Sequence, residues 1–309
     1  MVKTKGNGIV FHNKLRLIGY ASGIAGRDLH CGEGPMVIQQ SSYLSSLKKT
    51  NLSLDWSMIL PPSSSLLRKD ELVSLLCKEV AKKASIYTKE KFFFTVIGGD
   101  HSCAIGTWSG VYDALHHAGE IGLIWIDAHM DSHTPETTES GRIHGMPLAA
   151  LLGYGYESLT LLLHEAPKIK PENVCLIGVR SFERGEAELL KRLCVHTYFM
   201  EEVKQRGCVA ILKEAVNKVS QKTVGFGISI DLDALDPEEI PGVDAREPHG
   251  ISTTDLYEGI AQIISDPRLI AMEIAEFNPS RDEEHRTEKF IISFLEMIAS
   301  KKYYKRSDY

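Results

Sequence analysis

Short apolar runs alternate with longer amphipathic segments along most of this chain, and that alternation limits the folds it can adopt. The runs are rich in Ile, Val or Phe without clean two-residue alternation, as in strands buried on both faces of a parallel sheet. The predicted strands are Leu15–Tyr20, Phe92–Ile97, Ile121–Asp127, Val174–Val179, Val224–Asp231 and Leu269–Phe277. The predicted helices are Glu71–Tyr87, Glu183–Leu193, Glu202–Ser220 and Thr254–Ser265. We therefore expect an α/β fold in which helices cover a mainly parallel sheet.

The chain shows no division into separate folding units. Its 309 residues contain no internal repeat, low-complexity tract or Pro/Gly/Ser-rich linker, so we expect one domain over residues 1–309. Apolar residues make up 43% and charged residues 25%, the balance of a globular protein with a core. The net charge of -6 argues against a partner that is a nucleic acid, because such binders normally carry a basic excess.

The sequence gives no sign of a membrane or secretory destination. No stretch reaches the roughly 18 consecutive apolar residues that span a membrane, and the first residues lack the apolar run of a signal peptide. The six cysteines are scattered without a CxxC pair, which argues against structural zinc and against a disulfide framework. We expect a protein of the reducing cytoplasm.

Three of the predicted strands end in carboxylates or imidazoles. In open α/β sheets ligands bind beyond the carboxyl ends of the strands, so these residues lie where chemistry is expected. The segments are GGDHS at 98–102, DAHMD at 127–131 and SIDLDALDP at 229–237. If the chain stays extended, alternate residues of the second and third segments lie on one side. The side chains concerned are Asp100, His101, Asp127, His129, Asp131, Asp231 and Asp233.

A metal pair is the simplest way to hold these carboxylates together. Buried carboxylates repel one another and resist desolvation unless positive charge lies between them. Oxygen-rich ligands with a few imidazoles suit manganese, and two metals about 3.5–4 Å apart can share and activate a water. Each segment alone has a structural alternative, a turn for DxD and a helix cap for GGDHS. Together the three predict a metal centre.

The same segments carry a resemblance to a known family. With the loop TPETTESGRIHG at 134–145, they resemble the arginase-like ureohydrolases in order and in spacing, and Gly23–Pro35 and AEFNP at 275–279 also resemble family segments. The resemblance covers roughly residues 15–300. It implies a three-layer α/β/α sandwich around a mainly parallel eight-stranded sheet, two manganese ions per subunit, and a homotrimer or homohexamer.

The resemblance also implies roles for individual residues. One metal would be held by His101, Asp127, Asp131 and Asp231, and the other by His129, Asp127, Asp231 and Asp233, with Asp127 and Asp231 bridging. His144 would protonate the departing amine, unless it only packs at a loop–helix junction. Glu276 would pair with the substrate guanidinium, unless it only caps the next segment. The expected catalytic residues are His144, Asp131 and Glu276.

The outer part of the expected site resembles arginases in particular. In the loop before His144, the hydroxyls of Thr137, Thr138 and Ser140 are candidates to bind a substrate α-carboxylate. In the segment 178–186, Glu183 and Glu186 are candidates to bind the α-ammonium. These matches favour L-arginine as the guanidino substrate, hydrolysed to L-ornithine and urea.

The same region departs from the arginase pattern. His133 and Arg142, also counted among the expected substrate-binding residues, stand where arginases usually carry asparagine, and the stretch 243–248 lacks an expected threonine. The Arg142 fork could bind a carboxylate more strongly, hold a substrate with a second acid, or point to solvent. Two other functions therefore stay open. One is another ureohydrolase acting on agmatine, guanidinobutyrate or formiminoglutamate, and the other is a catalytically silent relative that binds metal or arginine.

Overall fold

A computed structural model describes residues 14–48, 53–63 and 66–303, so the expected lack of a signal peptide concerns residues outside the described chain. Its centre is an eight-stranded sheet with the strand order β2-β1-β3-β8-β7-β4-β5-β6, and every pairing of neighbours is parallel. The strands are β1 Lys14–Tyr20, β2 Ser53–Ile59, β3 Phe94–Gly98, β4 Ile121–Ile126, β5 Val174–Val179, β6 His196–Phe199, β7 Gly225–Asp231 and β8 Leu269–Ala275.

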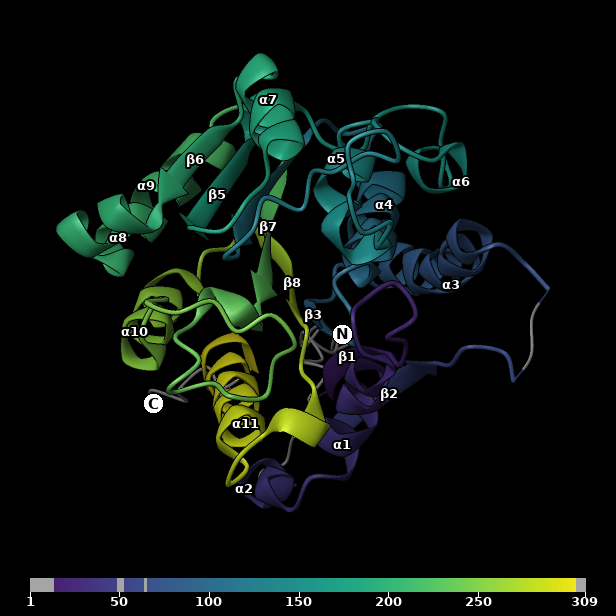
Figure 1. Ribbon diagram of the computed structural model, residues 1–309. Coiled ribbons are helices and arrows are strands. Elements are labelled where there is room, and N and C mark those ends of the chain that lie inside the picture. The colour runs from purple at the N-terminus through teal and green to yellow at the C-terminus, as the bar shows by residue number, and fades with distance from the viewer. Residues whose placement is uncertain (1–13, 49–52, 64–65, 304–309) are drawn as a thin grey trace, which may run out of the picture.

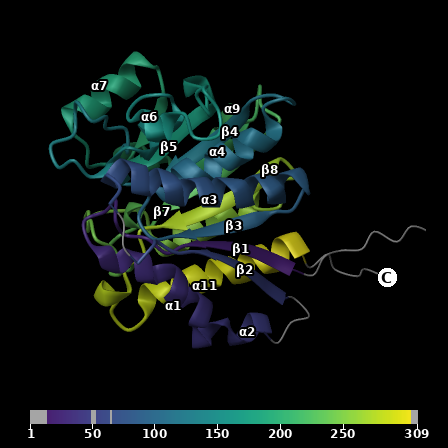
Figure 2. The same cartoon turned by 90° about the vertical axis from the view of Figure 1, so that its right-hand side faces the viewer.

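Helices cover both faces of this sheet (Figure 1). Residues of α3, α4 and α5 form one core with the strands, and residues of α1, α9, α10 and α11 form a second core on the opposite face. Figure 2 shows α3 along one side of the strands and α11 along the other. The helices are α1 Gly34–Gln40, α2 Ser45–Lys48, α3 Lys69–Lys89, α4 Cys103–Leu115, α5 Pro147–Leu151, α6 Glu157–Thr160, α7 Arg184–Arg192, α8 Met200–Arg206, α9 Cys208–Val219, α10 Thr253–Ile263 and α11 Arg286–Ile298. The predicted three-layer α/β/α sandwich is confirmed.

The six predicted strands correspond to β1, β3, β4, β5, β7 and β8. Sequence reasoning missed β2 and β6, the two edges of the sheet, because their polar and partly exposed residues do not form an apolar run. The single helix expected over 202–220 is instead α8 and α9, separated at Gly207, whose φ of +85° is readily adopted by glycine. Among the described residues no helix is both long enough and apolar enough to cross a membrane.

Close packing of α4 on the sheet gives one prediction about stability. Trp108 is fully buried against Gly227 of β7, where an added Cβ would lie 1.9 Å from the indole Cζ3. We expect Gly227→Ala to lower the free energy of unfolding by at least about 2 kcal/mol, because overpacking a dense core typically costs 1–3 kcal/mol. Denaturant unfolding measures this loss. Gly145→Ala, whose Cβ would find its nearest neighbour at 3.8 Å, is the control. Equal unfolding midpoints for the two variants would contradict the packing argument.

Candidate metal centre and substrate pocket

The three polar segments meet at the carboxyl edge of the sheet. The strands β3, β7 and β4 lie in its middle, with β8 between β3 and β7. His101 follows β3, Asp127 follows β4, and Asp231 is the last residue of β7. The parallel order of these strands therefore brings residues that are far apart in the sequence to one place.

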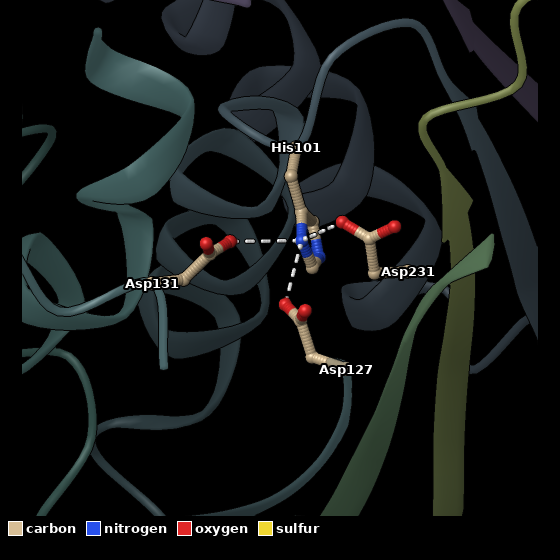
Figure 3. A group of neighbouring side chains, drawn as sticks. All are labelled: His101, Asp127, Asp131 and Asp231. Atoms are coloured by element: carbon tan, nitrogen blue, oxygen red, sulfur yellow. Dashed lines mark ion pairs between the residues drawn. The ribbon is translucent and has the colours of Figure 1, made fainter. Parts of the chain in front are cut away.

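A first cluster forms around one nitrogen of His101 (Figure 3). Its Nδ1 lies 3.0 Å from Asp131 Oδ2, 3.0 Å from Asp231 Oδ2 and 3.4 Å from Asp127 Oδ2. All four side chains are buried. On the other side of the ring, Nε2 lies 2.8 Å from Ser229 Oγ, and that hydroxyl donates to Glu273. Because the hydroxyl proton is directed at Glu273, Nε2–H is the donor and Nδ1 keeps a free lone pair for a metal.

A second cluster lies beside the first and shares Asp127 with it. His129 Nδ1 is 3.1 Å from Asp233 Oδ2 and 3.4 Å from Asp127 Oδ1. The ligand atoms of Asp127, His129 and Asp233 lie close enough together to hold a second ion. Asp231, which was expected to bridge both ions, belongs only to the first cluster in this structure. The six expected ligands are thus brought together in two adjoining groups.

These carboxylates converge through turns, so the extended conformation on which the predicted strand alternation depended is not present. Asp131 has a left-handed φ of +47°, and Asp231 caps a short 3₁₀ turn at Leu232–Ala234. Asp127 Oδ1 accepts from the backbone N–H of His129 at 2.7 Å, and Asp231 Oδ1 from that of Asp233 at 2.9 Å. The buried turns need these acceptors, because an unpaired N–H inside the protein is costly.

The charge balance of the clusters fits divalent cations. Burial and the charge of Asp127 raise the pKa of Asp131 to about 7, and burial with the charges of Asp233 and Asp127 raises the pKa of Asp231. His101 Nδ1 and Asp131 Oδ2 are buried without a hydrogen-bond partner. A cation between the carboxylates would relieve this repulsion and use both atoms. The donors are oxygens and imidazoles without a thiolate, a set that suits harder ions.

Glu276 lies next to the first cluster, where β8 ends. Its φ is +67°, a conformation that costs a non-glycine residue about 1–3 kcal/mol and is typical of functional sites. Its Oε1 accepts from the backbone N–H of His101 at 2.8 Å and lies 3.0 Å from His144 Nδ1. Burial alone would lower the pKa of His144, but the charge and hydrogen bond of Glu276 raise it above its usual value. Glu276 therefore both supports the backbone and holds His144.

A cavity of about 260 Å³ opens over the clusters. Its lining residues are Arg27, His129, Asp131, His133, Glu139, Ser140, Arg142, His144, Gly145, Glu183, Glu186, Asp231, Asp233 and Ala245. Thr137 and Thr138, expected to bind substrate, are not among them. The Thr137 hydroxyl accepts from the N–H of Thr134 and the Thr138 hydroxyl from that of Gly141. The Thr138 hydroxyl thus serves a backbone group of its own loop, while the Thr137 hydroxyl also lies 3.1 Å from His133 Nδ1. Glu276 also lies outside the lining and is only 3% exposed.

Sequence reasoning missed several residues of the site. The residues Arg27, Glu139 and Ala245 line the cavity but were not predicted to bind substrate. For Arg27, the sequence signal was its place in the segment Gly23–Pro35, which resembles the family. Arg180 donates to the carbonyl oxygens of Asp233 and Glu247, each at 2.8 Å, and so fixes the loop that carries Asp233. A single arginine does not form a spaced sequence motif that would indicate this role, so only the structure identifies it.

Comparisons with known proteins match most of this chain in sequence and in fold. The sequence model of the Arginase family matches residues 14–300. An arginase from Bacillus subtilis is 36% identical over 275 residues, which is 87% of this chain and 92% of that protein. A crystal structure of B. subtilis arginase superposes with a TM-score of 0.85 at 34% identity, covering 93% of this chain and 98% of that one. An Entamoeba histolytica arginase in complex with L-ornithine superposes with a TM-score of 0.84 at 28% identity, covering 93% and 98%.

Proposed function

Since this chain belongs to the arginase family and is a hydrolase of the guanidino C–N bond, we propose that it hydrolyses L-arginine to L-ornithine and urea with two manganese ions per subunit. The observation that carries this proposal is the cavity itself. Its lining joins residues of both carboxylate–imidazole clusters to His144 and to the loop that begins at His133. The amoebal arginase whose structure contains L-ornithine, the amino acid product of the proposed reaction, supports this proposal.

The six expected ligands are the residues that would hold the metals. His101, Asp127, Asp131 and Asp231 form one set, and His129, Asp127 and Asp233 form the other. When bound, the cations would supply a water of lowered pKa as the nucleophile and stabilise developing negative charge. The oxygen-rich donor set supports manganese.

Glu276 and His144 complete the proposed reaction. The Glu276 carboxylate is buried beside the first cluster and outside the cavity lining, and its charge attracts the cationic guanidinium toward the clusters. His144, held by Glu276 at 3.0 Å and lining the cavity, carries the proton that the departing amine of ornithine needs. Its raised pKa keeps the imidazole protonated closer to neutral pH.

The role of His144 can be separated from substrate binding. We expect His144→Asn to lower kcat for L-arginine by about 10²–10⁴, the usual contribution of a general acid, with KM changed only a few-fold. Steady-state urea release measures both constants. His116→Asn, a change on α4's C-terminal end away from the cavity, should leave both constants at native values. A native kcat in the His144 variant would remove the histidine from the reaction.

The overall function is tested by urea release from manganese-loaded protein, with L-arginine and agmatine assayed in parallel and a chelator as control. Chelator-sensitive turnover of L-arginine supports the proposal. Turnover of agmatine, guanidinobutyrate or formiminoglutamate without turnover of L-arginine would indicate another ureohydrolase. Manganese retention with no product from any of these compounds would indicate the silent, metal-binding alternative.

Location and assembly are further parts of the proposal. All six cysteines are free thiols and five of them are buried, which supports a reducing compartment and hence the cytoplasm. The homotrimer or homohexamer implied by the family resemblance remains a prediction. Light scattering during gel filtration distinguishes these states from a monomer.

A further inference from the structure

Two arginines, Arg27 and Arg142, line the cavity. In the described part of the chain, the guanidinium groups of Arg27 and Arg142 form neither a hydrogen bond nor an ion pair, although both side chains line the cavity. By contrast, the guanidinium groups of Arg180, Arg246 and Arg268 hydrogen-bond to backbone or side-chain oxygens. Arg27 comes from the segment after β1 and Arg142 from the loop before His144. Two segments far apart in sequence thus direct free guanidinium groups to one pocket.

The acids expected to bind a substrate ammonium are already occupied. Glu183 Oε2 lies 2.5 Å from His133 Nε2, which is also 3.4 Å from Glu186. Both Glu186 oxygens accept backbone N–H groups, from Ser132 at 3.2 Å and from Glu183 at 3.0 Å. Burial raises the pKa of Glu186 to about 7, which weakens its negative charge near neutral pH. An incoming ammonium must therefore compete with an imidazole and with backbone donors.

Outside the metal clusters, the remaining acid of the cavity lining is Glu139. Glu139 lines the cavity but is exposed to solvent, as is Arg27, and an exposed ion pair contributes little; Arg142 is half-buried. The two free guanidinium groups present planar forks that match a carboxylate in a two-pronged geometry. Binding a carboxylate there breaks no existing bond of the protein, whereas binding an ammonium at Glu183 does.

We propose that this enzyme recognises the outer end of its substrate through a carboxylate held by Arg27 and Arg142, and that the α-ammonium of L-arginine is dispensable because His133 already occupies Glu183 and Glu186. The inference rests on the proposed function and extends its substrate class from L-arginine to guanidino carboxylates with or without an α-amino group. His133 and the two arginines then determine specificity.

Three compounds that differ by one group each test the proposal. 5-Guanidinopentanoate lacks only the ammonium of L-arginine, and agmatine lacks only the carboxylate. We expect kcat/KM for 5-guanidinopentanoate within about tenfold of that for L-arginine, and for agmatine about 100-fold lower, the range for losing a charge-assisted hydrogen-bonded pair. Urea release from the manganese-loaded enzyme gives all three values.

Single substitutions test whether Arg27, Arg142 and His133 cause the expected substrate preference. Arg27→Gln and Arg142→Gln should each raise KM for both carboxylates by about tenfold, leaving kcat and all agmatine constants near native values. His133→Asn should free the two acids and so increase the preference for L-arginine over 5-guanidinopentanoate several-fold. Arg192→Gln on α7, exposed and outside the cavity lining, is the matched control and should change nothing.

The outcomes separate this inference from the function on which it rests. If L-arginine is hydrolysed but agmatine is an equal or better substrate, or 5-guanidinopentanoate is inert, the inference is overturned and the function stands. If none of the three compounds yields urea, the proposed function fails. Calorimetric binding of 5-guanidinopentanoate and agmatine to the metal-loaded protein then decides the inference. Preferential binding of the carboxylate supports it, and agmatine preference or no binding of either compound overturns it.

Discussion

Replacing Asp127 with asparagine is expected to abolish retention of both metals and to lower kcat/KM for L-arginine by more than about a thousandfold. Loss of a residue that only hydrogen-bonds to a metal ligand typically lowers metal affinity or activity 10- to 100-fold, and loss of a ligand shared by both clusters should cost more. Asp127 is the one carboxylate that belongs to both clusters. Its Oδ1 accepts from the N–H of His129, and its Oδ2 accepts from Trp125 Nε1 at 2.8 Å while facing His101 Nδ1. Asparagine keeps the size of the side chain but removes its charge and one of the two acceptors.

The same variant has a second signature that a merely unfolded protein would lack. Metal-free Asp127→Asn should still unfold cooperatively, but at a lower temperature than metal-free native protein. Burial opposes the Asp127 charge, yet the hydrogen bonds of His101 and His129 outweigh it and lower the pKa of this carboxyl, so the charge stabilises the folded state. Added manganese should raise the unfolding temperature of the native protein but not of the variant. Elemental analysis gives the metal content. Asp236→Asn, in the loop after β7 that carries Asp233 but outside the clusters, is the control. A variant that retains two metals and native turnover would refute the assignment.

The sequence predicts the centre of this fold better than its edges. The strands β3, β4, β5, β7 and β8 are flanked by other strands and covered on both faces, so they appear as uninterrupted apolar runs. The edge strands β2 and β6 have partly exposed residues and no such run. Whether a strand lies at the edge depends on the order of all strands in the sheet, so the local sequence pattern does not predict it.

The candidate site divides in the same way. Ligand types at strand ends are visible in the sequence, because parallel strands must deliver their carboxyl ends to one edge. The local geometry was not visible, since the left-handed φ of Asp131 depends on its packed surroundings. Nor could the chain pattern show that Thr137 serves its own loop or that His133 pairs with Glu183. Both contacts join a side chain to a neighbour that only the folded loop brings near.

The second large loss of activity is expected for Glu276→Gln, and this loss should occur without loss of the metals. We expect kcat/KM for L-arginine to fall by about a hundred- to a thousandfold, because truncating or neutralising one partner of a buried charge pair costs 2–5 kcal/mol. Glutamine can still accept from the N–H of His101, so the backbone and the metal content should be preserved. The neutral amide, however, attracts the guanidinium far less than a carboxylate does.

The pH profile of that variant tests the link between Glu276 and His144. The Glu276 charge raises the pKa of His144, so removing it should lower that pKa. If protonated His144 is the general acid, kcat of the variant must then decline at a lower pH than kcat of the native enzyme. Glu283→Gln, an exposed change outside the cavity lining, is the control. Native kcat/KM, or loss of manganese together with activity, would show that Glu276 acts by some route other than the guanidinium and His144.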